Sequence, residues 1–211
     1  MNTSLPSEAA SAVAQPLSDG ERSDRSYATR IVHLLLLLVV LNQLVGSQFM
    51  DPPDPGEAPS SVYVIHQYSG LAGFAVVAAF WIWTLVRRGE TSVGRLVPWL
   101  SRRRLRDVGV DLAAQLRRLM RGRGPDDSDG ALSSAVHGLG LLAVTAMAAT
   151  GSLWFFAHGT PAAHLAMDVH TTIANLVWAY LFAHASLAVI HWALGSNIFA
   201  RMFWPSRRAA S

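Results

Sequence analysis

Four long apolar segments divide the chain, and together they contain a single charged residue, Arg30. They span residues 28–50, 62–86, 132–156 and 171–194. With a rise of about 1.5 Å per residue, each is long enough as a helix to cross a hydrocarbon layer of roughly 30 Å. A water-soluble bundle would instead carry polar side chains along one face of every helix. The pattern therefore predicts an all-α membrane protein, an up-and-down bundle of four transmembrane helices.

Arginines are distributed unevenly over the segments that flank these spans. The connections 51–61 and 157–168 contain none, whereas the other three flanks are rich in them. Positively charged residues are retained on the cytoplasmic side of a membrane. We therefore expect both termini and the long connection 87–130 to be cytoplasmic. The membrane domain would comprise residues 27–202, between cytoplasmic tails at 1–26 and 203–211.

The long connection contains a helical pattern of a different kind. Five apolar residues recur there at three- and four-residue spacing: Leu105, Val108, Leu112, Leu116 and Leu119. With arginines close by, this spacing predicts an additional interfacial helix that lies along the cytoplasmic headgroups. Gly109 and the acidic Asp107 and Asp111 weaken the pattern, and a solvated arginine-rich linker is the alternative.

Composition narrows the chemistry that the chain can perform. It has no cysteine, which excludes disulfides, iron–sulfur ligation, thiolate catalysis and covalently attached haem. All 17 basic residues are arginine and the net charge is +3, but the arginines cluster beside apolar spans. We therefore expect them to meet membrane headgroups rather than nucleic acid. Residues 1–26 are polar, lack the apolar core of a signal peptide and are expected to be disordered.

Histidine remains as the main candidate ligand. Of eight histidines, six lie in or at the ends of the spans: His33, His66, His137, His170, His184 and His191. An ionisable side chain at such a depth costs roughly several kcal/mol unless it faces the bundle interior and has a partner. One isolated histidine is explained equally well by a hydrogen bond between helices. Six of them favour a set of metal ligands.

Depth in the membrane pairs four of these histidines. His33 lies near the cytoplasmic end of the first span, and His66 lies near the outer end of the second. His170 begins the fourth span, and His184 follows 14 residues later, about 21 Å deeper and on the same helix face. Depth therefore predicts two pairs, His66 with His170 and His33 with His184. A haem iron held between the two imidazoles of a pair would have no open position, which suits electron transfer rather than oxygen binding. The haem between His33 and His184 would then be the inner one, on the cytoplasmic side.

The other histidines have weaker claims to a ligand role. His137 starts the third span at the cytoplasmic level and competes with His33 or His184. His191 lies roughly 10 Å closer to the cytoplasm than His184, where a headgroup or propionate contact is expected. His158 and His164 are expected to be solvated loop residues. Arg30 and Arg201 are candidates for contacts with the inner haem's propionates, and ordinary flanking charge explains them equally well.

Motifs in all four spans match one known family. In the first three spans they comprise Tyr27, Arg30, His33, Gly46, His66, Gly70, His137 and Gly151. In the fourth, His170, His184 and His191 are spaced by 14 and then seven residues and are followed by Arg201 and Met202. This pattern resembles the bacterial cytochrome b561 family, which includes the b-type cytochrome subunits of nickel–iron hydrogenases. Leu34 departs from the tryptophan common in the family, and the connection 87–130 is longer than in its smallest members.

The resemblance implies two haem b groups and transfer of single electrons across the bacterial inner membrane. It also implies exchange with a quinone or quinol. Tyr63 and Gln67 are candidate quinone contacts, but a role as interfacial anchors explains them equally well, so the sequence does not locate the quinone site. Whether the chain is an enzyme with quinone oxidoreductase activity is left open. One alternative is a membrane-anchor cytochrome b subunit of a hydrogenase- or formate-dehydrogenase-like complex, serving a redox partner subunit. Another is a haem-free transporter whose histidines bind a divalent metal or relay protons. A homodimer is also compatible with the sequence.

Overall fold

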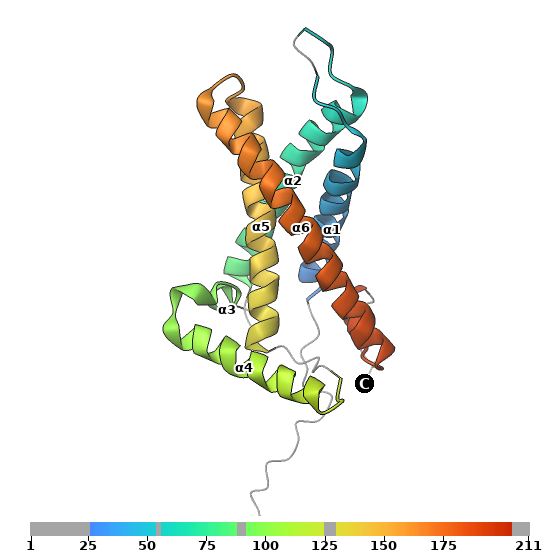
Figure 1. Cartoon of the computed structure of the whole chain (residues 1–211), viewed down its shortest axis with the longest axis vertical. Helices are drawn as coiled ribbons and strands as arrows, with labels where there is room; N and C mark the ends of the chain where they lie inside the picture. The colour runs from blue at the N-terminus through green and yellow to red at the C-terminus, as the bar shows by residue number, and fades with distance from the viewer. Residues whose placement is uncertain (1–25, 54–55, 88–91, 125–129, 204–211) are drawn as a thin grey trace, which may run out of the picture.

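The computed structural model describes residues 26–53, 56–87, 92–124 and 130–203, and they form a helical bundle (Figure 1). The tails were predicted at 1–26 and 203–211, and all but residues 26 and 203 of them lie outside the described residues. The long helices are α1 (Tyr27–Gly46), α2 (Ser61–Val86), α4 (Arg102–Met120), α5 (Ala131–Phe156) and α6 (Pro161–Ala193). Shorter ones are η2 (Ser47–Phe49), α3 (Val93–Leu96), η3 (Pro98–Leu100) and α7 (Ile198–Phe203). Four of the long helices, α1 with η2, α2, α5 and α6, are long and apolar enough to cross a membrane. This confirms the predicted all-α membrane fold.

Hydroxyl side chains fix where the first two of these helices begin. Ser26 accepts a hydrogen bond from the Thr29 backbone N–H before α1, and Ser60 accepts one from Tyr63 before α2. Each satisfies a backbone donor that has no partner inside the helix. The observed starts of α1 and α2 lie within one residue of the predicted ones.

The predicted start of the fourth span is wrong. Hydropathy predicts it at residue 171, but α6 begins at Pro161, so the preceding turn contains only residues 157–160. Thr160 caps the helix by accepting from the Ala163 N–H, and Gly159 forms the turn with a φ of +82°. Proline at the first helical position fits this start, because its missing N–H would be unpaired there anyway. His164, expected in a loop, is therefore helical.

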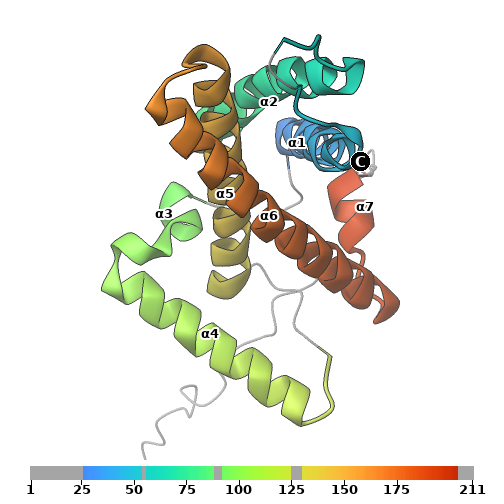
Figure 2. The same cartoon turned by 45° about the horizontal axis from the view of Figure 1, so that its top comes forward.

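The end of α6 turns the chain back toward α1. Gly195 adopts a φ of +90°, and the Ser196 N–H donates to the His191 carbonyl at 2.9 Å, which closes the helix with a Schellman motif. The short α7 follows and packs against both α6 and α1 (Figure 2). Phe203, the first residue of the predicted cytoplasmic tail, is the last residue of α7.

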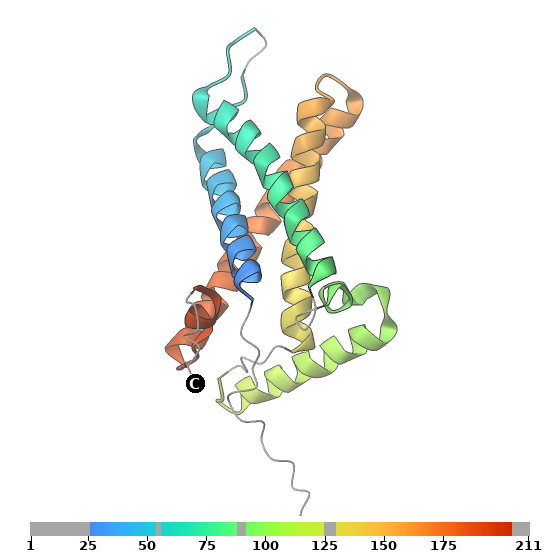
Figure 3. The same cartoon turned by 180° about the vertical axis from the view of Figure 1, so that it is seen from behind.

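The helices pack in the order α1, α2, α5, α6, and α2 crosses α5 (Figure 3). Polar side chains join neighbouring helices inside the bundle. Trp83 Nε1 of α2 donates to Thr29 Oγ1 of α1 at 2.9 Å, and Trp81 Nε1 donates to Thr145 Oγ1 of α5 at 3.0 Å. Only 6% to 17% of the most apolar 18-residue window of each span is buried within the bundle. The remaining apolar surface is available to lipid.

The predicted amphipathic helix is α4, which lies across one end of the bundle (Figure 1). Asp111 of α4 accepts a hydrogen bond from the Leu132 N–H at 2.9 Å, and so caps α5, whose own N-cap residue is Gly130. Gly138 lets α3 pack on α5, because a Cβ there would overlap the Leu96 carbonyl oxygen. The helix itself is confirmed, and its cytoplasmic location stays a prediction.

Candidate functional site

Two cavities follow one another along the bundle, and the predicted ligands divide between them. We call the cavity near the turn 157–160 the outer cavity and the one near α4 the inner cavity. The outer cavity, of about 440 Å³, is lined by His66 of α2 and His170 of α6. The inner cavity, of about 180 Å³, is lined by His33 of α1, His184 of α6 and also His137 of α5. The division follows the predicted pairs.

An apolar layer separates the two cavities. Val40 of α1, Val144 of α5 and Val177 of α6 line both of them, and Val177 is buried. The cavities therefore adjoin each other through side chains that carry no polar group.

His66 and His170 face each other in the outer cavity. Their ring centres are 6.4 Å apart, with an angle of 84° between the ring planes. A metal lies roughly 2 Å from an imidazole nitrogen, and the ring centre lies about 1 Å beyond it, so one metal ion between two rings separates their centres by roughly 6 Å. The observed spacing matches that value. The angle is compatible with it, because each ring can turn independently about the axis through the metal.

Residues of α5 fix the protonation pattern of the His170 ring. His170 Nδ1 lies 3.1 Å from the Met147 carbonyl oxygen and 3.0 Å from Thr150 Oγ1. A carbonyl oxygen can only accept, so Nδ1 carries the proton and Nε2 keeps its lone pair. Gly151 leaves room for this ring, because a Cβ there would lie 3.1 Å from His170 Cε1. The second ring nitrogen is thus ready to bind a metal, as in other protein metal sites.

The backbone at His66 is held by α1. Gln43 Nε2 donates to the His66 carbonyl oxygen at 3.1 Å and to Ser69 Oγ at 2.7 Å. His66 Nδ1 is buried and has no hydrogen-bond partner within the described structure.

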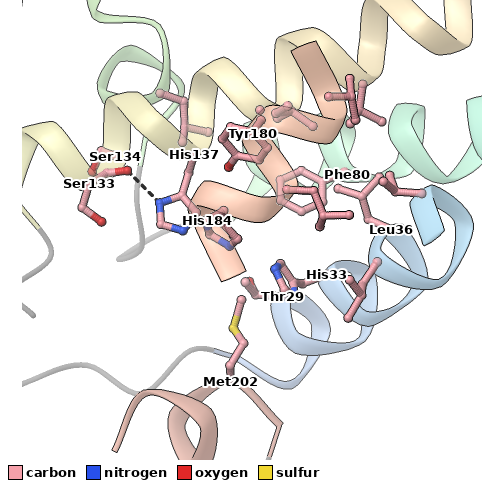
Figure 4. A pocket seen from close by; sticks show the side chains of 18 of the residues that line it. Thr29, His33, Leu36, Phe80, Ser133, Ser134, His137, Tyr180, His184 and Met202 are labelled. Atoms are coloured by element: carbon pink, nitrogen blue, oxygen red, sulfur yellow. Dashed lines mark hydrogen bonds between the residues drawn. The ribbon is translucent and has the colours of Figure 1, made fainter. Parts of the chain in front are cut away.

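Three histidines surround the inner cavity (Figure 4). The ring centres of His137 and His184 are 5.1 Å apart, and the Tyr180 ring stacks on His184 at 5.4 Å. His33 lies against Phe203 of α7 with 6.3 Å between ring centres, and its Nδ1 is buried without a hydrogen-bond partner in the described structure. Each cavity therefore contains a histidine whose hydrogen-bonding capacity the described residues do not satisfy.

Arg30 and His191, two of the other predicted contacts, are not among the described residues that line the inner cavity. Arg30 is half-buried in the first turn of α1. Arg201 belongs to α7, and its side chain lies outside the described structure. His191 Nδ1 contacts the Leu187 carbonyl of its own helix at 2.7 Å.

The two histidines expected in the outer loop contact one tryptophan instead. The Trp154 ring lies 4.9 Å from the His158 ring and 5.7 Å from the His164 ring. Trp154 Nε1 donates to the Tyr63 hydroxyl at 3.4 Å, and both of these aromatic residues line the outer cavity. His158 and His164 are exposed, as predicted, although His164 belongs to α6.

The histidine pairs fit a metal whose other ligands come from a cofactor. Within the described ranges, no group of three His, Asp or Glu residues is placed to hold a bare metal ion. A haem iron needs only two further ligands, because the porphyrin supplies four. Paired imidazoles in apolar cavities, with a free Nε2 on His170 and unsatisfied Nδ1 atoms on His33 and His66, are therefore compatible with haem.

Comparison with known proteins agrees with this chemistry. Residues 25–205 match the family model described as prokaryotic cytochrome b561. No curated protein and no solved structure matches the chain. The family match includes all four apolar helices and every candidate ligand. The chain therefore belongs to the prokaryotic cytochrome b561 family and is a b-type membrane cytochrome of electron transfer.

Proposed function

We propose that the chain binds two haem b groups, the outer one between His66 and His170 and the inner one between His33 and His184. The observation that carries this proposal is the 6.4 Å separation of the His66 and His170 rings, which leaves space for one iron between them. The family membership supports haem b over the haem-free transporter. Two haems follow from the presence of a histidine pair in each of two adjoining cavities.

For the inner haem, His33 is the better partner of His184 than His137 is. The His137 and His184 ring centres, 5.1 Å apart, are about 1 Å too close for an iron between them. His137 is also exposed. His33 faces the same cavity from α1, on the side opposite α5, and Phe203 packs beside it.

Haem iron, when bound, supplies the one-electron carrier, and the residues of the bundle control access to it. Two imidazoles would hold each iron, and most of the surface of each cavity is apolar. His170 and His184 lie about 21 Å apart along α6, and the Val40, Val144 and Val177 layer lies between the two cavities. Electrons would then pass along the bundle axis, from one side of the membrane toward the other.

We further propose that the outer cavity exchanges electrons with a quinone or quinol. Tyr63 and Gln67 line this cavity and can form hydrogen bonds with a quinone oxygen, and Trp154 holds the Tyr63 hydroxyl in place. Copurification would show whether the cytochrome works alone, as a homodimer, or as the anchor for a hydrogenase- or formate-dehydrogenase-like partner.

The arginine distribution supports an orientation with both termini and α4 on the cytoplasmic side of the bacterial membrane. The inner cavity would then lie near the cytoplasm and the outer cavity near the opposite face.

A spectrum of the purified protein tests the di-haem proposal. We expect reduction to give sharp b-type absorption bands, and a haem assay to give two haems per chain. A colourless protein, or a protein that saturates with one haem, would contradict the proposal.

A further inference from the structure

Arg87 introduces a charge at the inner cavity that the outer cavity lacks. It is the residue at which α2 ends, it is half-buried, and its side chain lines the inner cavity beside Thr29 and His33. Among the described residues around this cavity, Arg87 alone carries a fixed charge. The described lining of the outer cavity contains no Asp, Glu, Lys or Arg.

The Arg87 guanidinium lies at the edge of a hydroxyl cluster between α1 and α2. Arg87 Nη1 is 3.5 Å from Thr29 Oγ1, which also lies 2.9 Å from Trp83 Nε1 and 2.9 Å from Ser26 Oγ. Thr29 Oγ1 has two lone pairs, and the two nearer donors, Trp83 and Ser26, can occupy both of them. The contact with Arg87 is therefore the weakest of the three. A planar group with five N–H donors therefore lies beside this cluster and at the wall of the inner cavity.

The level of this group matches the edge of the proposed inner haem. Thr29 lies one helical turn before His33 on the same side of α1, about 6 Å along the helix. A carboxylate close to hydrocarbon is costly without a cation, and a guanidinium can bind a carboxylate through two parallel hydrogen bonds. We propose that Arg87 binds a propionate of the inner haem, an inference that rests on the proposed His33 and His184 site.

Arg87 was not among the propionate contacts predicted from the sequence, which were Arg30 and Arg201. Arg30 is one position from Thr29, but the described cavity lining does not include it. The same carboxylate-binding chemistry would also suit a lipid phosphate at the membrane surface, so the experiment must separate these two anions.

Redox titration of Arg87→Gln in neutral detergent tests the proposal. Removing a positive charge near the iron favours the ferric form, so the inner haem's potential should fall. We expect about a tenfold change in the ratio of reduced to oxidised haem, or roughly 59 mV for a one-electron couple. The haem that shifts should be the one retained in His66→Ala. Haem content should stay at two per chain.

Two further variants control for charge and position. Arg87→Lys keeps the charge and should lower the potential less than Arg87→Gln does. Arg95→Gln removes an exposed arginine of α3 that does not line the cavity, and both haem potentials should stay unchanged.

The possible outcomes separate this inference from the di-haem proposal. Two haems with an unshifted inner potential in Arg87→Gln would overturn the role of Arg87 alone, whereas fewer than two haems in the native protein would overturn both. A shift seen in phosphatidylglycerol nanodiscs but not in neutral detergent would assign Arg87 to a lipid phosphate and overturn the propionate contact. If Arg87→Gln does not accumulate, Arg87→Met, which keeps a long unbranched side chain without the charge, should still lower the inner potential, and no change there would overturn the inference.

Discussion

At the scale of single residues, α5 prepares the outer site although it contributes no proposed ligand to it. Met147 and Thr150 hold His170 Nδ1, and Gly151 leaves space for the ring. These three residues follow one another along one turn of the helix. The orientation of His170 therefore depends on the packing of α5 against α6 and not only on α6 itself.

Substitution of Gly151 tests this dependence. In Gly151→Val, the added side chain would push against the His170 ring, whose Cε1 lies 3.1 Å from the position of the new Cβ. We expect the variant to lose most of its outer haem while it keeps the inner one. Gly46→Val is the matched control, because nothing lies within 4 Å of its Cβ position. Equal haem content in the two variants would show that the ring tolerates the contact.

Alanine substitutions of the histidines test the proposed pairs. His66→Ala and His170→Ala should remove the same outer haem, and His33→Ala and His184→Ala should remove the same inner haem. Each variant should retain about half of the native haem, because the other site keeps both of its ligands. Haem per chain and the reduced-minus-oxidised spectrum measure this.

His137→Ala and His191→Ala serve as controls in that series and should retain two haems. If His137→Ala lost one haem while His33→Ala kept two, His137 would be the inner ligand and the proposed pairing of His33 with His184 would be wrong.

The four candidate ligands could be found from the sequence because their depth follows from residue counts along helices. The residues around them could not be found in this way. Gln43, Thr150, Tyr180 and Arg87 contact the histidines or line their cavities through the rotation of each helix about its axis, which hydropathy does not fix. His137 was recognised as a competitor, but its 5.1 Å approach to His184 depends on how α5 and α6 pack.

At the scale of whole elements, α6 shows why hydropathy alone can misplace the start of a helix. Hydropathy placed its start ten residues too late, because the first turns of α6 contain Asp168 and three small alanines rather than a strongly apolar run. The local signal was Thr160 followed by Pro161, a cap residue and a proline at the first helical position. The predicted histidine pairing is independent of this error, because it uses the 14-residue interval between His170 and His184, which does not change with the helix start.

The leucines of α4 do not lie on the face that packs against the bundle but on a neighbouring face of the helix. Its half-buried residues are Val108, Asp111, Ala114 and Gln115. Leu105, Leu112, Leu116 and Leu119 are 44% to 53% exposed. At about 100° per residue, the centres of these two faces are roughly a quarter turn apart. A helix beside the bundle end can then place its leucines in the hydrocarbon edge and most of its arginines among the headgroups.

Fluorescence quenching tests this position of α4. The chain has no cysteine, so Leu112→Cys and Arg103→Cys each create a unique labelling site on opposite sides of the helix. In lipid bilayers that contain shallow nitroxide lipids, a label at 112 should be quenched several times more strongly than one at 103. Equal quenching at the two positions would favour a solvated helix.

At the scale of the whole molecule, the absence of cysteine also allows a direct test of orientation. In intact cells, an impermeant maleimide should label Glu57→Cys and leave Arg123→Cys unlabelled, because arginine-rich segments stay in the cytoplasm. Permeabilised cells should label both variants, which controls for reactivity. Labelling of residue 123 but not of residue 57 in intact cells would reverse the orientation of both cavities.

The bundle has little core of its own to hold it together. Apart from Pro98, the buried apolar residues within the described ranges are Leu44, Val77, Leu96, Ala135, Leu141, Ala163, Ala166 and Val177. Three of them are alanines, and two cavities occupy much of the interior between the helices. A ligand that binds only the folded form stabilises it in proportion to its concentration and affinity. Cells starved of iron or of porphyrin precursors should therefore clear this polypeptide by membrane proteolysis, so its abundance would report on cofactor supply.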